Sequence, residues 1–225
     1  MRPIMNYCFA VGKGWATLIF DKLGSDQFRT RIGEKMPLKR DSILKAAERL
    51  LALYGVDGIR LRDIAAEAGV SIGLIQHHFG SRDDVVREML LAANEERIRQ
   101  WTAQLDGVED NRERLRLLLS GALSSRERCI VWTESCAAAS RNDFLQPLVS
   151  ATNNAWRSWV VETIERGVAD GTFTLRASPA ETAKMLVALV DGLMLAVAAD
   201  DDGITLEQAS NLLLHAVAPH VGIDF

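Results

Sequence analysis

The fold is decided by one stretch of sequence, LRDIAAEAGVSIGLIQHHFGSR, residues 61–82. Apolar residues recur there at three- and four-residue steps, which is the helical period, and Gly69 interrupts them. Ala65 is small where two helices would cross, Gly69 allows a left-handed turn, and Ile75 can fill the space between the helices. Two short helices joined by such a turn are typical of the DNA-binding helix-turn-helix. Since any helical hairpin can contain Ala and Gly, these residues alone leave a purely structural hairpin as the alternative.

A longer segment, residues 38–98, resembles the N-terminal domain of the TetR family of transcriptional repressors. The resemblance rests on Gly55-Val56-Asp57-Gly58, on the run DIAAEAGVS at 63–71, on Gly73, and on His77-His78-Phe79-Gly80-Ser81-Arg82. It implies a three-helix DNA-binding domain at 38–98 with its helix-turn-helix at 61–80. It also implies that residues 99–225 bind an effector and form a dimer. This second part is most similar to the subgroup of choline-responsive, BetI-like repressors.

Three positions depart from the family pattern. Gln76 stands where a tyrosine usually touches the DNA backbone, and Arg60 stands where a Ser or Thr usually caps the second helix. Arg82 replaces the commoner lysine and can still bind a phosphate, with a fork of donors in place of a point charge. We expect these changes to affect which operator is bound and to leave DNA binding itself intact.

DNA contacts are expected at the start of the second helix of the motif. Free backbone N–H groups there favour phosphate, and Gln76 can form a bidentate pair with adenine in the major groove. Basic side chains would bind phosphates and fix the register. The predicted DNA-contacting residues are Lys39, Arg40, Arg60, Ser71, Ile72, Gly73, Gln76, His77 and Arg82. For His77, a position without a DNA contact is an equal alternative, and His78 and Phe79 are expected in the core.

The composition is that of an ordinary soluble globular protein. The 225 residues carry a formal net charge of -4, and 48% are hydrophobic and 25% charged. Residues 1–105 contain 16 basic and 13 acidic side chains, whereas residues 106–225 contain 10 and 17. This asymmetry suggests that the N-terminal half meets a polyanion. Three scattered cysteines are too few for a disulfide framework or a zinc site, which favours a cytoplasmic protein without metal or cofactor.

The remaining pattern predicts an all-α chain of about nine helices. No proline lies between Pro37 and Pro147, and apolar residues keep the helical period throughout that stretch. Helices are expected at about 40–54, 61–68, 71–79, 82–105, 112–124, 128–140, 143–169, 179–199 and 206–218. Capping boxes are expected at Ser81–Asp84, Ser178–Glu181 and Thr205–Gln208. Residues 1–37 are expected to be an N-terminal extension; residues 1–35 do not fit the pattern and are either a poorly ordered arm or precede a true start at Met36.

The last two predicted helices are apolar on more than one side. The longest apolar stretch, Met185–Ala199, is interrupted by Asp191 and Gly192 and is too short to span a bilayer, so no membrane contact is expected. A symmetric four-helix contact between two chains would cover such helices. The predicted homodimer interface is Leu186, Val190, Leu193, Val197, Leu206, Ala209, Leu213 and Val217. A dimer would place two recognition helices on half-sites of a palindromic operator; a well-covered monomer is the alternative.

Tryptophans are concentrated in the middle of the chain. They are expected either to pack in the core or to line an effector pocket between helices. Glu134 and Asp191 are acidic residues within largely apolar helices, where a carboxylate is costly unless it is paired. Tryptophans and carboxylates together suit a cationic ligand, so a quaternary amine is one candidate effector. The predicted pocket residues are Trp101, Trp132, Glu134, Cys136, Trp156, Trp159, Thr163 and Asp191.

Together these patterns predict a dimeric repressor that a small molecule of unidentified chemistry releases from its operator. Two alternatives stay open: a DNA-binding regulator without an effector, and an all-α enzyme. The enzyme is disfavoured because the sequence contains no nucleophile–base pair, phosphate loop or metal cluster. Gly12-Lys13-Gly14 has neither the spacing of a dinucleotide fingerprint nor that of a P-loop.

Overall fold

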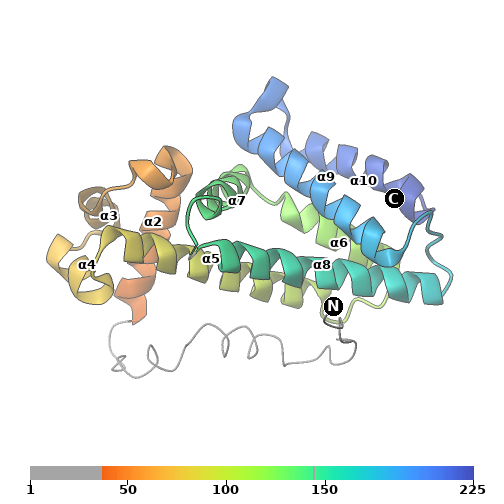
Figure 1. The fold of residues 1–225 in the computed structure, drawn as a ribbon, viewed down its shortest axis with the longest axis horizontal. Coiled ribbons are helices and arrows are strands. Elements are labelled where there is room, and N and C mark those ends of the chain that lie inside the picture. The colour runs from red at the N-terminus through yellow and green to blue at the C-terminus, as the bar shows by residue number, and fades with distance from the viewer. Residues whose placement is uncertain (1–36, 144) are drawn as a thin grey trace, which may run out of the picture. The chain divides into compact units, whose positions relative to one another are not determined.

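The computed structural model describes residues 37–143 and 145–225, and the predictions for residues 1–36 lie outside this part of the chain. The described elements are all helical (Figure 1), which confirms the all-α prediction. They are α2 (Pro37–Gly58), α3 (Leu61–Ala68), α4 (Ile72–Phe79), α5 (Arg82–Leu105), α6 (Asn111–Ala122), α7 (Arg126–Ala139), α8 (Leu145–Ala169), α9 (Pro179–Ala199), the 3-10 turn η3 (Asp201–Gly203) and α10 (Leu206–Val221). From Arg40 onward these elements belong to one compact unit.

Three of the helices begin with a capping box. In this arrangement the cap side chain accepts the backbone N–H three residues later, and the side chain at that position accepts the N–H of the cap. The boxes are Ser81–Asp84 in α5, Ser178–Glu181 in α9 and Thr205–Gln208 in α10, as predicted. Each N-cap stabilises its helix by about 1 kcal/mol.

The first three helices and the start of α5 pack around one apolar cluster. Its largest and most deeply buried members are Ile43, Leu51, Ile64, Ile75, Met89 and Leu90. Gly55, with φ of 67°, interrupts α2 one residue beyond the predicted helix end at Tyr54. Val131 of α7 and Leu145 and Leu148 of α8 belong to the same cluster. The core of the N-terminal helices therefore continues into the C-terminal helices.

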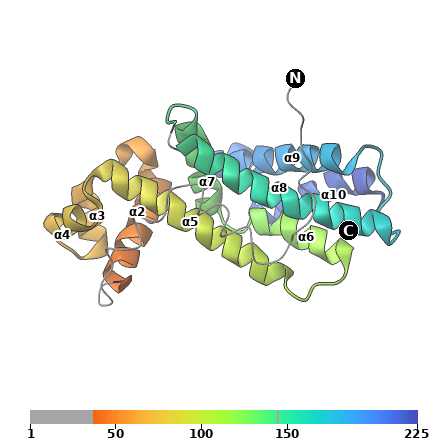
Figure 2. The same cartoon turned by 60° about the horizontal axis from the view of Figure 1, so that its bottom comes forward.

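The remaining helices and the second half of α5 enclose a second apolar cluster. Figures 1 and 2 both show α5 extending from α4 toward α6, so that it reaches both clusters. α9 packs against α7, α8 and α10. With 21 residues, α9 is long and apolar enough to cross a membrane, by length and composition alone. Its apolar character is instead accounted for by Leu186, Val190 and Val197, which are buried in the second cluster.

The stripe predicted for the homodimer faces the core of the chain itself. Six of its eight residues are at most 4% exposed within one chain: Leu186, Val190, Val197, Ala209, Leu213 and Val217. Leu193 and Leu206 are half-buried and pack against the same cluster. Another face of these helices stays open, where Leu195 of α9 and Leu212 of α10 are each 54% exposed. A partner chain that contacts α9 and α10 must therefore meet this outer face.

Candidate DNA interface and effector pocket

The turn between α3 and α4 has the geometry that the sequence predicts. Gly69 is left-handed, with φ of 65° and ψ of 37°. The Val70 N–H donates to the Ala65 carbonyl over 3.0 Å, which closes the turn. Ser71 then caps α4 by accepting the Leu74 N–H over 3.2 Å. These bonds fix the direction in which α4 leaves the turn.

α4 presents one face to solvent and the opposite face to the core. Ile72, Gly73, Gln76 and His77 are exposed, and their spacing places them on one side of the helix. Phe79 is buried on the other side together with Ile75. His78 is half-buried, and burial lowers the pKa of its imidazole. An α-helix with such a free face fits the major groove of B-DNA.

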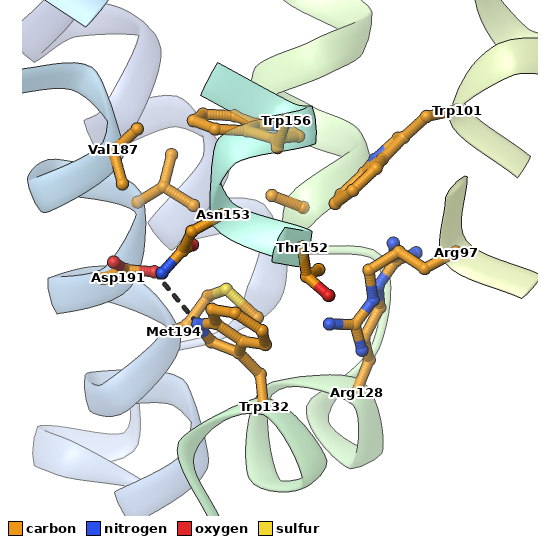
Figure 3. A pocket seen from close by; sticks show the side chains of 12 residues that line it. Arg97, Trp101, Arg128, Trp132, Thr152, Asn153, Trp156, Val187, Asp191 and Met194 are labelled. Atoms are coloured by element: carbon orange, nitrogen blue, oxygen red, sulfur yellow. Dashed lines mark hydrogen bonds between the residues drawn. The ribbon is translucent and has the colours of Figure 1, made fainter. Parts of the chain in front are cut away.

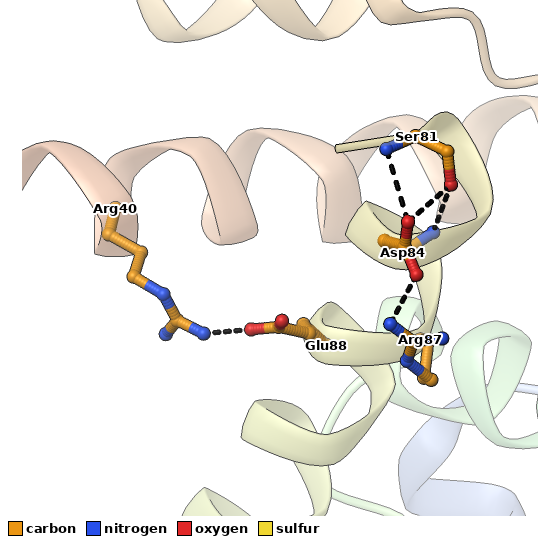
Figure 4. A network of polar contacts seen from close by, with 5 residues as sticks. All are labelled: Arg40, Ser81, Asp84, Arg87 and Glu88. Carbon is orange, nitrogen blue, oxygen red and sulfur yellow. Dashed lines mark hydrogen bonds and ion pairs between the residues drawn. The ribbon is translucent and has the colours of Figure 1, made fainter. Parts of the chain in front are cut away.

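Two of the arginines predicted to bind phosphate are engaged within the domain. Arg40 forms an ion pair with Glu88 of α5 (Figure 4), and its guanidinium lies 5.2 Å from the centroid of the Phe79 ring. Arg82 donates from Nε to the Ile59 carbonyl over 3.1 Å. Arg40 therefore ties α2 to α5, and Arg82 ties α5 to the segment before α3.

The other predicted DNA contacts differ in their local roles. Lys39 and Arg60 are exposed. Arg60 occupies the N-cap position of α3 without a side-chain cap, as its departure from the family pattern implies. Ser71 is exposed, and its hydroxyl oxygen serves the α4 cap described above. Because the cap uses only a lone pair of this oxygen, Ser71 could donate to a phosphate through its backbone N–H or its hydroxyl O–H.

A pocket lies among the C-terminal helices, lined by side chains of α5, α6, α7, α8 and α9 (Figure 3). Its charged and aromatic lining consists of Arg97, Trp101, Arg128, Trp132, Trp156 and Asp191. Thr152 and Asn153 add polar groups, and Ala122, Val187, Val190 and Met194 complete the wall. The free space is about 30 Å³, enough for one or two water molecules. A larger ligand would have to displace lining side chains.

Two guanidinium groups share this pocket. Arg97 is 7% exposed, and in the described part of the chain no carboxylate oxygen lies within 4.0 Å of it. Burial, followed by the charge of Arg128, lowers the pKa of Arg97 to about 10. Arg128 donates from Nη1 to the Ser124 hydroxyl over 3.0 Å, while its Nη2 is buried and has no acceptor among the described residues. Burial lowers the pKa of Arg128 as well.

The guanidinium groups lie over the pocket tryptophans. The Arg97 Cζ lies 5.5 Å from the ring centroid of Trp132, and the Arg128 Cζ lies 5.4 Å from that of Trp101. Both distances are in the cation–π range. The Trp132 Nε1–H donates to Asp191 Oδ1 over 3.0 Å, and burial raises the pKa of the Asp191 carboxyl.

Four of the predicted pocket residues lie outside this lining. Thr163 accepts a hydrogen bond from Arg114 Nε over 3.2 Å. Trp159 packs edge-on against Trp101, with ring centroids 5.8 Å apart. Cys136 is half-buried against the second cluster, and burial raises the pKa of its thiol to about 11. The fourth residue, Glu134, has a different position.

Glu134 joins α7 to the end of α2. Its Oε2 accepts the Val56 N–H over 3.1 Å, directly after the break at Gly55. A Cβ atom at Gly55 would lie 3.1 Å from the same oxygen, so the carboxylate sits close against the α2 backbone. Glu134 therefore contacts the end of α2 instead of the pocket.

The sequence predictions missed Arg97, Arg128, Thr152 and Asn153 as pocket residues. A charged residue in a helix is normally taken as solvated, which hid the two arginines. A signal for them is nevertheless in the sequence. Arg97 precedes Trp101 by four residues, and Arg128 precedes Trp132 by four, so each pair shares a helix face.

Two family models match the chain in succession. The model "Bacterial regulatory proteins, tetR family" matches residues 43–89, which include the helix-turn-helix. The model "BetI-type transcriptional repressor, C-terminal" matches residues 111–222, which include α6 to α10. The order of the two models agrees with the order of the two clusters in the fold.

Individual relatives agree with these matches. The BetI regulator of Agrobacterium fabrum is 27% identical over 161 residues, which are 70% of this chain and 75% of that one. The KstR2 repressor of Mycolicibacterium smegmatis is 28% identical over 140 residues, which are 60% and 67% of the two chains.

Solved structures give the same result over nearly their full length. A regulator from Saccharomonospora viridis, solved in complex with choline, has a TM-score of 0.75 and 29% identity, over 80% of this chain and 95% of that one. A TetR-family regulator from Rhodococcus sp. has a TM-score of 0.68 and 31% identity, over 83% and 100%. With the helix-turn-helix at its N-terminal end, this chain belongs to the TetR family and is a DNA-binding transcriptional regulator.

Proposed function

We propose that this regulator is a homodimeric repressor that leaves its operator when a small molecule enters the pocket. The observation that carries the proposal is the course of α5, a single helix of 24 residues. Val85 and Met89 near its start belong to the first apolar cluster, which is the core of the N-terminal helices, whereas Arg97 and Trp101 line the pocket. Val85 and Trp101 are about 24 Å apart along the helix axis at 1.5 Å per residue. A tilt of α5 at the pocket would therefore move the DNA-binding domain.

The DNA contacts belong to the exposed face of α4 and the basic residues around it. Gln76 would pair with a base in the major groove, His77 would donate to a base or phosphate, and Ile72 would contact a thymine methyl. Lys39 and Arg60 would bind phosphates, together with the N–H groups at the start of α4 near Ser71 and Gly73. Arg40 and Arg82 would support this surface, since each already holds helices of the domain together. Operator DNA as the partner implies a cytoplasmic protein.

The effector would act by favouring a state with a wider pocket. About 30 Å³ of free space does not admit a metabolite, so binding would displace lining side chains and, with them, shift α5, α7, α8 or α9. The contact of Glu134 with Val56 and the place of Val131 in the N-terminal core join α7 to the DNA-binding domain. Such a shift changes the spacing of two recognition helices in a dimer. The ligand shifts the equilibrium by its difference in affinity for the two states.

A second copy of the chain would cover the outer face of α9 and α10. Leu195 and Leu212 supply exposed apolar surface there, and Ala188 and Gly192 let another helix approach closely. The two-fold symmetry of such a dimer matches a palindromic operator.

Titration of the DNA upstream of the chain's own coding region tests the proposal. We expect binding that weakens steeply with salt, because phosphate contacts release counterions. Binding should also weaken when an effector saturates the pocket. Absence of sequence-specific binding, or an effector that saturates the protein and leaves operator affinity unchanged, would contradict the repressor mechanism.

A further inference from the structure

The effector pocket contains an excess of hydrogen-bond donors. The side chains of Arg128, Trp101 and Trp156 each hold a buried N–H group that lacks an acceptor within the described residues, at Nη2, Nε1 and Nε1 respectively. Arg97 adds a nearly buried guanidinium without a paired carboxylate there. The Thr152 hydroxyl is not one of these unpaired donors, because it donates to the Leu148 carbonyl over 3.1 Å. Buried donors are costly unless they are paired, so this pocket suits a ligand that brings acceptors.

The net charge of the pocket lining also favours a ligand that brings acceptors. Arg97 and Arg128 supply two positive charges, and Figure 3 shows their side chains on the same side of the pocket, near Thr152. Asp191 supplies a single carboxylate, and that carboxylate already accepts the Trp132 Nε1–H. The balance is positive, and an anion between the two guanidiniums would offset their mutual repulsion.

The same arrangement opposes a quaternary ammonium. A cage for such a cation needs free aromatic faces. Here the face of Trp132 is covered by Arg97 at 5.5 Å, and that of Trp101 by Arg128 at 5.4 Å. A ligand cation would have to displace a guanidinium and then stay beside it. The choline bound by the regulator from Saccharomonospora viridis is therefore a poor guide to the ligand of this chain.

We propose that the effector is an organic carboxylate with an apolar body, whose charged group is bound by Arg97 and Arg128 between the indoles of Trp101, Trp132 and Trp156. The proposal rests on the proposed function, because it names the ligand class of the same pocket. The planar fork of a guanidinium matches a carboxylate through two parallel hydrogen bonds. The indoles, with Val187 and Met194, would hold the apolar body.

The test compares three matched probes: 4-phenylbutanoate, 4-phenylbutanol and (3-phenylpropyl)trimethylammonium, followed by a series of other aryl- and alkylcarboxylates. Tryptophan fluorescence of the full chain reports binding, because three indoles line the site. We expect a carboxylate of the series to bind about tenfold tighter than its matched alcohol, and the ammonium to bind more weakly than both. Arg97→Gln and Arg128→Gln should each remove that tenfold preference, and Arg97→Lys should retain part of it.

The control is Arg99→Gln, two residues away on α5, whose exposed side chain pairs with Glu96. It should bind the carboxylate as the wild type does, and circular dichroism checks that every variant is folded. The proposal is overturned if no carboxylate of the series binds, if the ammonium binds at least as tightly, or if folded Arg97→Gln keeps the preference. Operator binding without any probe is measured in parallel. If the chain does not bind its operator, the proposed function is contradicted. If it binds the operator but the carboxylate test fails, only the anion assignment is contradicted.

Discussion

Among single residues, Gln76 has the most to contribute to base recognition. Its side chain is exposed in the middle of the free face of α4, at a position where the family usually places a tyrosine. We expect Gln76→Ala to weaken operator binding by about 1–3 kcal/mol, because a bidentate contact to adenine is lost. Fluorescence anisotropy with operator variants should show relaxed preference at one base pair in each half-site.

The matched control for Gln76 is Gln100→Ala. Gln100 is an exposed glutamine on α5 that donates to Glu96 over 2.8 Å. This variant should bind the operator with unchanged affinity. If Gln76→Ala reduces affinity equally for every sequence, Gln76 contacts only the backbone, as the family tyrosine does.

Asp191 makes stability depend on pH. Burial raises the pKa of its carboxyl above the ordinary value, so the ionised form is less favourable in the folded chain than in the unfolded chain. Its charge therefore lowers stability at pH values above the folded pKa, and this loss fades as the pH falls through that pKa toward the ordinary value. Asp191→Asn keeps an oxygen that can accept the Trp132 Nε1–H. We expect it to stabilise the fold at neutral pH by up to about 1 kcal/mol, after allowance for partial exposure.

Thermal unfolding across the acid range measures this difference. The difference in unfolding temperature between Asp191→Asn and wild type should narrow as the pH falls. A gap that widens toward acid pH would show that the sign of the effect has been assigned incorrectly.

Residue roles were predictable where local geometry dictates them. Glycine is favoured at position 69 because φ is positive there, and the exposed face of α4 follows from helical spacing around Ile75 and Phe79. Arg97 and Arg128 were not found, because burial of an arginine depends on contacts between distant helices. The crossed arrangement, with Arg97 over Trp132 and Arg128 over Trp101, cannot be read from either helix alone.

At the scale of the elements, a glycine sets how closely α8 meets the segment after it. Gly167 is buried, and a Cβ atom there would lie 2.1 Å from Cδ2 of Phe173. The Phe173 N–H donates to the Gly167 carbonyl over 2.8 Å, so the ring cannot easily retreat. We expect Gly167→Ala to destabilise the chain by about 1–3 kcal/mol through overpacking. Chemical denaturation measures the loss.

Two further variants separate overpacking from helix propensity. In Gly121→Ala of α6 the new methyl would meet the flexible end of Gln104 at 3.1 Å, and that side chain can move aside. Its stability should stay within about 0.5 kcal/mol of wild type. Adding Phe173→Leu to Gly167→Ala should recover part of the loss. Equal losses in Gly167→Ala and Gly121→Ala would contradict the packing explanation.

Helix boundaries were the most predictable part of the fold. α3 and α9 span the predicted residues, 61–68 and 179–199, because their ends are marked by Gly69 and by the Ser178–Glu181 box. α10 extends three residues beyond its predicted end, through Pro219 to Val221. A proline in the last turn removes one backbone donor without ending the helix, and Gly222, with φ of 69°, ends it.

For the whole molecule, the sequence could indicate a dimer but not which face of α9 forms the interface. α9 is apolar nearly all round, so its periodicity contains an inner stripe and an outer stripe of similar strength. The stripe through Leu186, Val190 and Val197 forms the chain's own core. Only the packing of α7, α8 and α10 around α9 decides which side is left for a partner.

The outer face of α9 and α10 gives the prediction that concerns the whole assembly. Leu195 and Leu212 are the large apolar side chains that stay exposed on these two helices. Leu195→Glu and Leu212→Glu should each dissociate the dimer, because two like charges would face each other across a symmetric contact. Operator affinity should fall about 10²-fold or more, because two linked half-site contacts become independent. Val168→Glu, at a 44% exposed site on α8, should stay dimeric. Sedimentation velocity measures the oligomeric state of each variant. If both leucine variants remain dimeric, the interface lies elsewhere.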